Sequence, residues 1–215
     1  MSCSRHEMMV ETAPPSRLNL RTAAPALLAA SAGAAAIWAA AFGLLPPLSG
    51  MTAPELRLLF AIKCAAISLL FTLVLGIEAV AHERLLSDAF DPLAGRETKR
   101  LRINQRFIQN TLEQSVLFLA GLLALSFYCA SGSSMRAVVA CTVVWTLSRL
   151  VFWVGYHIAP EHRVAGLIGT AQSLAVLIYV CVSFGYEIAG VIGATAPLAL
   201  FFIAEGAIFI AVKRR

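Results

Sequence analysis

The stretch RINQRFIQNTLEQSVLF, residues 102–118, begins with arginines and runs directly into an apolar segment. Side chains three or four residues apart share a helix face, and four polar residues follow that spacing: Arg102, Arg106, Asn110 and Glu113. Glu113 would lie about 10 Å along the helix axis from Arg106, at about 1.5 Å per residue. A carboxylate that deep in a bilayer needs a partner, so this stretch predicts both a membrane helix and a functional site.

The composition is that of a membrane protein with several spans. Of the 215 residues, 59% are hydrophobic and only 13% are charged, against roughly 25% charged in soluble domains. Several apolar runs reach the roughly 20 residues that a spanning helix needs. The five cysteines show no metal-type spacing, and four of them lie within apolar runs. The net charge of +5 comes mostly from arginines near the ends of the spans, which indicates membrane topology and argues against nucleic-acid binding.

The chain divides into six expected spans. Residues 1–22 form a polar, basic tail, and residues 23–48 hold a first, alanine-rich span. An uncleaved anchor and a signal peptide cut near residues 39–41 are the two interpretations of this span, and its length favours the anchor. The sixth span is expected to be irregular, because its first half contains two glycines and a proline. The later spans are expected at Leu56–Ala81, Phe107–Ala130, Ala137–His157, Val164–Phe184 and Ile188–Val212.

The positive charge alternates between the two sides of the expected bundle. Basic residues gather in the N-terminal tail, in the loop 82–106, in the turn 157–163 and at the C-terminal residues 213–215. The opposite loops hold only Arg57 and Arg136, close to their ends. Cytoplasmic loops carry an excess of lysine and arginine. The sequence therefore predicts an integral, multi-pass membrane protein with both termini in the cytoplasm.

A second group of polar side chains is expected in the fourth span. Arg149 lies two turns from the cytoplasmic end of that span, at a depth similar to that of Glu113. We expect these two residues to pair, within a subunit or across a subunit interface, because each alone would carry a desolvation cost of several kcal/mol. The alternatives are an ion pair that fixes helix register and a cleft for a small anionic ligand. Four further side chains are predicted in the same layer: Arg106, Asn110, Tyr156 and Arg163.

The sequence contains no motif for an internal nucleophile, such as GxSxG, HExxH or a glycine-rich phosphate loop. His157 and His162 are five residues apart across a proline, so one helix face cannot present both and no metal site is expected. Glu205 is a lone acid in the last span, for which proton coupling and a snorkelling contact with Lys213 or an arginine are the alternatives. Three aromatic residues are expected at the membrane interface or facing lipid: Tyr128, Trp145 and Trp153.

Two of these patterns resemble the MAPEG family, the membrane-associated proteins of eicosanoid and glutathione metabolism. They are, in chain order, Arg106-x3-Asn110-x2-Glu113 and Arg149-x6-Tyr156-x6-Arg163. The resemblance implies an all-α fold, a polytopic transmembrane helix bundle with a four-helix core at residues 56–184. The spans within residues 23–48 and 187–212 would be an additional helix at each end of that core.

The resemblance also implies a membrane-embedded, glutathione-dependent transferase or peroxidase that acts on hydrophobic electrophiles or lipid hydroperoxides. It implies a homotrimer, with glutathione bound as cosubstrate between neighbouring subunits near the cytoplasmic face. Arg163 would be the catalytic residue, since a guanidinium near the thiol favours the reactive thiolate. By position, the glutathione-binding residues would be Arg106, Asn110, Glu113, Arg149, Tyr156 and, as a weaker candidate, Arg84.

The chain departs from the family pattern at two places. Phe152 stands where glutathione-binding members can have a tyrosine, and Gln114-Ser115 replaces an aromatic residue and a proline. Two alternatives to the enzyme are therefore kept. One is a non-catalytic member of the family that binds lipid or a partner, and the other is a small transporter.

Overall fold

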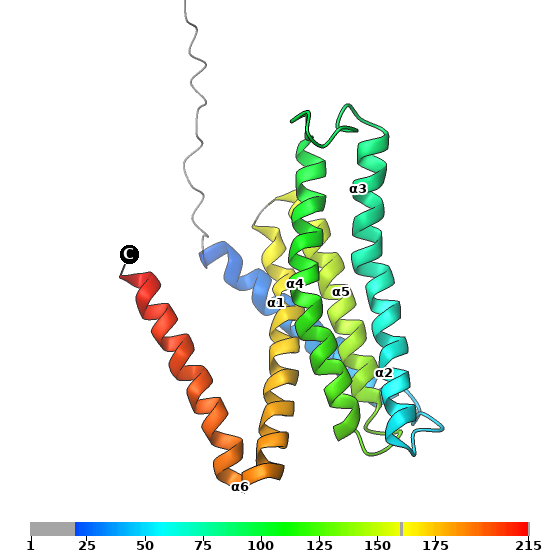
Figure 1. Cartoon of the computed structure of the whole chain (residues 1–215), viewed down its shortest axis with the longest axis vertical. Coiled ribbons are helices and arrows are strands. Elements are labelled where there is room, and N and C mark those ends of the chain that lie inside the picture. Colours follow the sequence, from blue (N-terminus) through cyan, green and yellow to red (C-terminus); the bar gives the residue numbers. More distant parts are fainter. Residues whose placement is uncertain (1–19, 160, 215) are drawn as a thin grey trace, which may run out of the picture.

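The computed structural model describes residues 20–159 and 161–214, and within them every regular element is helical. A π-helical stretch, η1 (Leu70–Val74), joins α2 to α3 in one rod, and a 3₁₀ helix, η2 (His162–Leu167), leads into α6. The helices form a bundle (Figure 1). Residues 1–19 of the expected tail lie outside the described residues. The α-helices are α1 (Leu20–Leu44), α2 (Pro54–Leu69), α3 (Leu75–Leu85), α4 (Lys99–Tyr128), α5 (Arg136–Ile158) and α6 (Ile168–Lys213).

The predicted all-α bundle is confirmed, and five helical runs in the described chain are long and apolar enough to span a membrane. The fifth and sixth expected spans are joined in the last run, which bends back at Ala189 (φ −142°, ψ 26°) and Gly190 (φ 59°, ψ −140°). Glycine enters positive φ at little steric cost. Across the bend, a Cβ on Gly185 or Gly193 would meet the carbonyl of the other residue. The predicted irregularity thus lies at the junction of the two spans.

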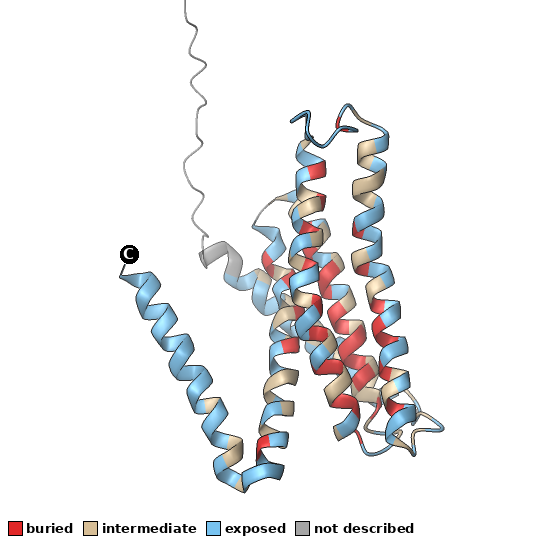
Figure 2. Ribbon diagram, viewed as in Figure 1, coloured by how far each residue is buried: buried red, intermediate tan, exposed pale blue. Residues whose placement is uncertain are grey.

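The second arm of α6 leaves the bundle after this bend, as Figure 1 shows. Its side chains are exposed along almost its whole length (Figure 2). Glu205 lies on this arm and is exposed, and its expected contact with Lys213 is not formed in the part of the chain that the structure describes. The arm is therefore a surface that only lipid or another protein can cover.

The basic start of α4 is helical, although the sequence predicted a loop over residues 82–106. The helix already begins at Lys99. Its N-cap is Thr98, whose Oγ1 accepts a hydrogen bond from the backbone N–H of Leu101 at 3.0 Å. Hydropathy marks where the chain enters the apolar layer, whereas the backbone hydrogen bonds of a helix continue beyond it. Arg106 therefore stands on a rigid helix.

The core lies where α2, α4 and α5 meet, and the buried residues of these helices face one another there (Figure 2). Phe118 of α4 and Trp145 of α5 stack with ring centroids 4.2 Å apart, and Trp145 is fully buried. The expectation that Trp145 faces lipid or the interface is wrong. Its apolar ring suits a helix contact as well as lipid, and the rotation of α5 turns it inward. Ser68 and Thr146 add a hydroxyl–hydroxyl bond of 2.6 Å between α2 and α5.

Arg57 and Arg136, the two basic residues of the opposite loops, both hold loop backbone in place. Buried Arg57 donates from Nη1 to the carbonyl of Cys129 at 2.8 Å, which ties the start of α2 to the α4–α5 loop. Arg136 donates from Nη1 to the carbonyl of Leu45 at 2.9 Å, which ties the end of α1 to α5. Both bonds satisfy carbonyls that a helix end leaves without an intrahelical partner.

Candidate functional site

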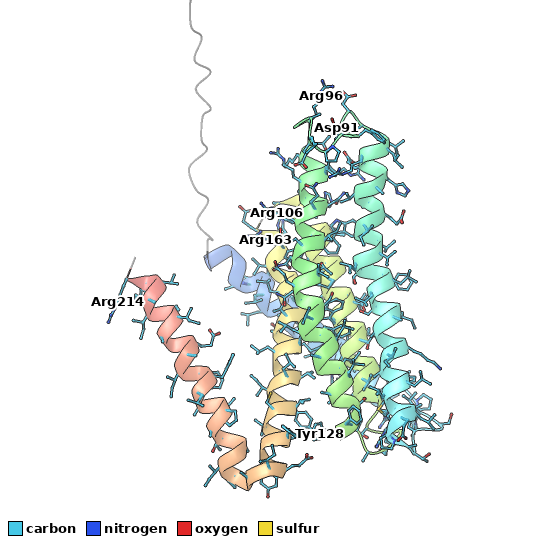
Figure 3. The ribbon with its side chains drawn as sticks, in the orientation of Figure 1. Asp91, Arg96, Arg106, Tyr128, Arg163 and Arg214 are labelled. Carbon is cyan, nitrogen blue, oxygen red and sulfur yellow. The ribbon has the colours of Figure 1, made fainter. Side chains whose placement is uncertain are left out.

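A polar cavity of about 220 Å³ lies between α4, α5 and η2. It is found towards the end of the bundle that carries the α3–α4 loop, and Figure 3 shows Arg106 and Arg163 next to each other there. Two of its lining residues are arginines and one is an acid, so its lining is basic. The cavity is lined by Arg106, Gln109, Asn110, Glu113, Phe152, Tyr156 and Arg163.

Arg149 lies directly behind this lining and is fully buried. Its Nη1 donates to Oδ1 of Asn110 at 2.8 Å, and its Nη2 donates to the carbonyl of Gly166 at 3.0 Å. The guanidinium stands 4.6 Å from the centroid of the Phe152 ring, which is a cation–π contact. Its Nε–H has no hydrogen-bond partner. The positive charge of Arg149 is thus buried among two neutral hydrogen-bond acceptors and one aromatic ring, and its Nε–H donor has no partner.

The predicted ion pair between Glu113 and Arg149 is not formed within the chain. The two ion pairs of the described residues join His82 to Glu78 and Arg100 to Glu83. Arg149 is turned towards α4 and η2, where Asn110 and Gly166 take its hydrogen bonds, while Glu113 lies on the exposed side of α4. The similar depth that the residue count predicts does not decide which way each side chain faces.

Two glycines bring η2 close enough to α5 to build the site. A Cβ on Gly155 would lie 2.7 Å from the carbonyl oxygen of His162, and a Cβ on Gly166 would lie 2.6 Å from the backbone nitrogen of Phe152. Real Cβ atoms do not approach backbone this closely, so both contacts require glycine. The result is that the Arg163 guanidinium lies 5.3 Å from the centroid of the Tyr156 ring.

The α4 side of the cavity carries a chain of hydrogen bonds. Nη1 of Arg106 donates to Oε1 of Gln109 at 3.1 Å, and Nε2 of Gln109 donates to Oε1 of Glu113 at 3.5 Å. The sequence prediction omitted Gln109. Its spacing was the available signal, because a residue three after Arg106 and four before Glu113 must share their helix face. Gln109 therefore sets the positions of two predicted ligand-binding side chains.

A partly buried polar cluster around Asn104 joins α4 to α5 next to the site. Oδ1 of Asn104, which is 1% exposed, accepts from Nε1 of Trp153 at 2.9 Å and also contacts Nε2 of His157 at 2.9 Å. The Trp153 ring stacks on Phe107 with centroids 4.8 Å apart. Trp153, expected at the interface or facing lipid, thus helps to hold α5 against α4, and His157 is engaged in the same contact.

The structure brings together six of the seven predicted site residues: Arg106, Asn110, Glu113, Arg149, Tyr156 and Arg163. Arg84 lies in the last turn of α3 and does not line the cavity. Arg102 lines a neighbouring cavity of about 300 Å³, which shares Arg106 and Tyr156 with the first. The basic stripe of α4, formed by Arg102 and Arg106, therefore extends beyond the site itself.

Comparison with known protein families gives one result. The model of the MAPEG family matches residues 58–183, which is more than half of the chain. The chain belongs to the MAPEG family. The matched region runs from α2 into α6 and contains every residue of the polar cavity. No curated protein and no solved structure matches the chain.

Membership in the MAPEG family and the long apolar helices make the chain an integral membrane protein whose helices contact the lipid bilayer. The membership indicates a membrane protein of glutathione-related transfer or of eicosanoid-type metabolism, and MAPEG members generally use glutathione. The first helix and the second arm of α6 lie outside the matched region.

Proposed function

We propose that the chain is a membrane-embedded, glutathione-dependent transferase or peroxidase for hydrophobic electrophiles or lipid hydroperoxides. The observation that carries this proposal is the buried Arg149, which has a free Nε–H and no carboxylate partner among the described residues. An unpaired buried charge is costly. An anionic ligand at the adjacent cavity would offset that cost, and glutathione is the anion that the family generally uses.

The charges of the site match those of the tripeptide. At neutral pH glutathione carries two carboxylates, one ammonium group and a thiol. The guanidinium groups of Arg106 and Arg149 would hold carboxylates through charge-assisted hydrogen bonds. Glu113 is the one acid of the lining and would hold the ammonium group. The amide of Asn110 and the hydroxyl of Tyr156 supply neutral hydrogen bonds at intermediate positions.

Arg163 is proposed to act on the thiol of glutathione. A free thiol has a pKa of about 8.5, and a nearby guanidinium stabilises the thiolate, which is the nucleophile. Each unit by which the pKa falls corresponds to about 1.4 kcal/mol of preference for the thiolate. In the transferase reaction the thiol proton would pass to solvent and the thiolate sulfur would form a bond to the electrophilic carbon, while the bond from that carbon to its leaving group breaks and the group departs with the electron pair. The reacting sulfur would thus belong to the cosubstrate, in accord with the lack of a nucleophile motif in the chain.

A homotrimer would complete the site, in keeping with the resemblance. Glu113 is exposed on the single chain and lies on α4 beside the exposed side chains Leu112 and Val116. A carboxylate facing lipid is unfavourable, so this face of α4 suits contact with another subunit. The arginine-rich end of the bundle is proposed to be cytoplasmic, with both termini on that side. A hydrophobic substrate would then reach the thiolate laterally from the bilayer.

Calorimetric titration of the detergent-solubilised protein with glutathione tests the proposed function. We expect saturable binding, and we expect Arg106→Ala to weaken it about tenfold, because one charge-assisted hydrogen bond is worth about 1.5 kcal/mol or more. Arg96→Ala, in the exposed α3–α4 loop, is the control and should bind normally. Absence of binding up to millimolar glutathione would rule out the enzyme and leave a non-catalytic MAPEG member.

The proposed role of Arg163 predicts a spectroscopic result. Addition of glutathione to the wild type at neutral pH should produce the ultraviolet absorbance of a thiolate. In Arg163→Ala this absorbance should disappear, while calorimetry should still detect glutathione, since the cation near the sulfur is lost and the carboxylate-binding arginines remain. Arg163→Lys should restore part of the absorbance. An undiminished thiolate signal in Arg163→Ala would remove this residue from the mechanism.

A further inference from the structure

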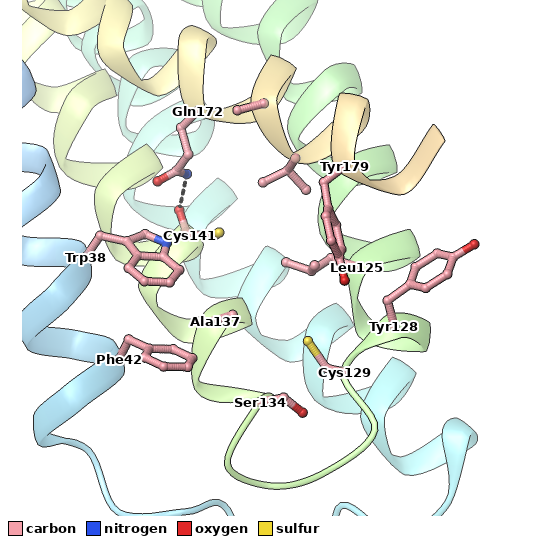
Figure 4. Close-up of a pocket in the computed structure, with 12 residues that line it drawn as sticks. Trp38, Phe42, Leu125, Tyr128, Cys129, Ser134, Ala137, Cys141, Gln172 and Tyr179 are labelled. Atoms are coloured by element: carbon pink, nitrogen blue, oxygen red, sulfur yellow. Dashed lines mark hydrogen bonds between the residues drawn. The ribbon is translucent and has the colours of Figure 1, made fainter. Parts of the chain in front are cut away.

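A second cavity, of about 480 Å³, lies at the opposite end of the bundle and shares no residue with the polar site. Figure 4 shows it between α1, the end of α4, the start of α5 and the first arm of α6. Its volume falls within the roughly 300–1,000 Å³ of small-molecule sites. Most of its lining is apolar or aromatic, and includes Trp38, Phe42, Leu125, Ala137 and Val176.

The composition of α1 explains why there is space here. This helix is rich in alanine, and small side chains cannot fill the gap to α5 and α6. Only its aromatic residues reach across, where Trp38 and Phe42 stack with centroids 5.0 Å apart. At another part of the lining, Nε2 of Gln172 donates to the carbonyl of Cys141 at 2.8 Å and joins α6 to α5 (Figure 4). The cavity is therefore enclosed by side chains from four helices, α1, α4, α5 and α6.

The cavity opens towards the bilayer. Two of its lining residues on α6, Ala175 and Tyr179, are exposed on the surface of the bundle. Cys129 is buried in the lining and contributes a thiol, a small side chain with only weak hydrogen-bonding capacity. Ordered water in this cavity would find few hydrogen-bond partners, so water is a poor occupant. Lipid acyl chains surround the protein at this depth and are the nearest apolar molecules.

A positive charge stands beside this apolar space. The Arg136 guanidinium lies 5.0 Å from the centroid of the Phe42 ring, and the next residue, Ala137, lines the cavity. Its described hydrogen bonds go from Nε to the carbonyl of Ser133 and from Nη1 to the carbonyl of Leu45. Both acceptors are neutral, and no carboxylate of the described chain forms an ion pair with it. The charge of Arg136 is thus available to an anion.

We propose that this cavity binds the acyl chain of an anionic lipid, with the acidic head group beside Arg136. The apolar lining accommodates the chain, and the guanidinium at the loop end of α5 attracts a carboxylate or a phosphate. The same chemistry is offered by a free fatty acid and by an anionic phospholipid of the surrounding leaflet. This site lies apart from the glutathione cavity and does not depend on the proposed enzyme activity. It is formed in part by α1, which lies outside the family-matched region.

Quenching of Trp38 fluorescence by dibromostearate, measured on the purified full chain in detergent, tests the chain-binding part. Bromine quenches on contact, so we expect saturable quenching that is lost in Trp38→Phe. Ala175→Phe fills the opening and should abolish the saturable component. Ala204→Phe places the same side chain on the exposed second arm of α6 and should leave it unchanged. Equal, non-saturating quenching in the wild type and in Ala175→Phe would overturn the proposal.

The head-group part is tested with Arg136→Gln and with nanodiscs of brominated phospholipids. Loss of the guanidinium should weaken dibromostearate binding about tenfold, while Arg136→Lys should retain most of it. In nanodiscs, stronger quenching by brominated phosphatidylglycerol than by brominated phosphatidylcholine supports a phospholipid occupant, and saturable binding of the free acid alone supports a fatty acid. Identical affinities in wild type and in a folded Arg136→Gln protein, together with equal quenching by both phospholipids, would refute the anionic head group.

Discussion

Replacement of Arg149 by methionine is expected to weaken glutathione binding roughly 10- to 100-fold while the protein stays folded. The buried guanidinium has no carboxylate partner in the described chain, and its only bonds go to an amide and a carbonyl oxygen. Apolar replacement of a buried charge is often neutral for stability or even stabilising. The Nε–H, which has no partner in the described chain, can give a ligand one charge-assisted hydrogen bond of about 1.5–3 kcal/mol, and its loss corresponds to roughly a 10- to 100-fold lower affinity. Binding and stability should therefore respond differently.

Two measurements on Arg149→Met separate these effects: calorimetric titration with glutathione, and thermal unfolding in the same detergent. Arg149→Lys keeps the charge but cannot donate to Asn110 and Gly166 in the same fork geometry, so we expect binding between that of wild type and that of Arg149→Met. Arg96→Met serves as the control for the loss of one positive charge. Wild-type affinity in a folded Arg149→Met protein would show that this residue has no part in binding the ligand.

Replacement of Gly166 by alanine is expected to destabilise the protein by about 1–3 kcal/mol or more, the range for overpacked cores. The added Cβ would lie 2.5 Å from Cα and 2.6 Å from the backbone nitrogen of Phe152. Backbone cannot move aside as a flexible side chain can, so η2 must shift away from α5. The carbonyl of Gly166 would then leave Nη2 of Arg149, and Arg163 would leave Tyr156. Glutathione binding should be lost together with stability.

Thermal unfolding and glutathione titration check the Gly166→Ala prediction. The matched control is Gly206→Ala on the second arm of α6, where a Cβ would meet nothing within 4 Å. Alanine is favoured over glycine in a helix by up to about 1 kcal/mol, so this control should be neutral or slightly stabilising. Unaltered unfolding and binding in Gly166→Ala would contradict the close approach of η2 and α5 on which the site depends.

Much of the site could be predicted from local pattern. The steps from Arg106 to Asn110 to Glu113 are four and three residues, and such spacing places side chains on one helix face in any fold. The same rule applies to Arg149 and Tyr156 on α5. It would also have found Gln109, had the spacing been applied to every polar residue of the stretch.

The partners of these residues could not be predicted in the same way. Depth along a helix follows from residue count, and the count predicts Glu113 and Arg149 at one level. The rotation of α5 against α4 decides which side chain Arg149 meets, and it meets Asn110. Rotation follows from packing over the whole interface, including Trp145 against Phe118 and Trp153 against Phe107. Helical periodicity holds no information about that packing.

The sequence by itself determined that this protein is a multi-span helical membrane protein of the MAPEG pattern, because hydropathy and helical spacing are local properties of the chain. The tertiary structure decided how the basic stripe of α4 becomes a cavity. It does so through Gly155 and Gly166, whose missing Cβ atoms let η2 approach the backbone of α5 and bring Arg163 over Tyr156. It also decided that α1 leaves an apolar space beside Arg136. Distances between helices depend on how side chains from separate segments interlock, and only the folded chain brings those segments together.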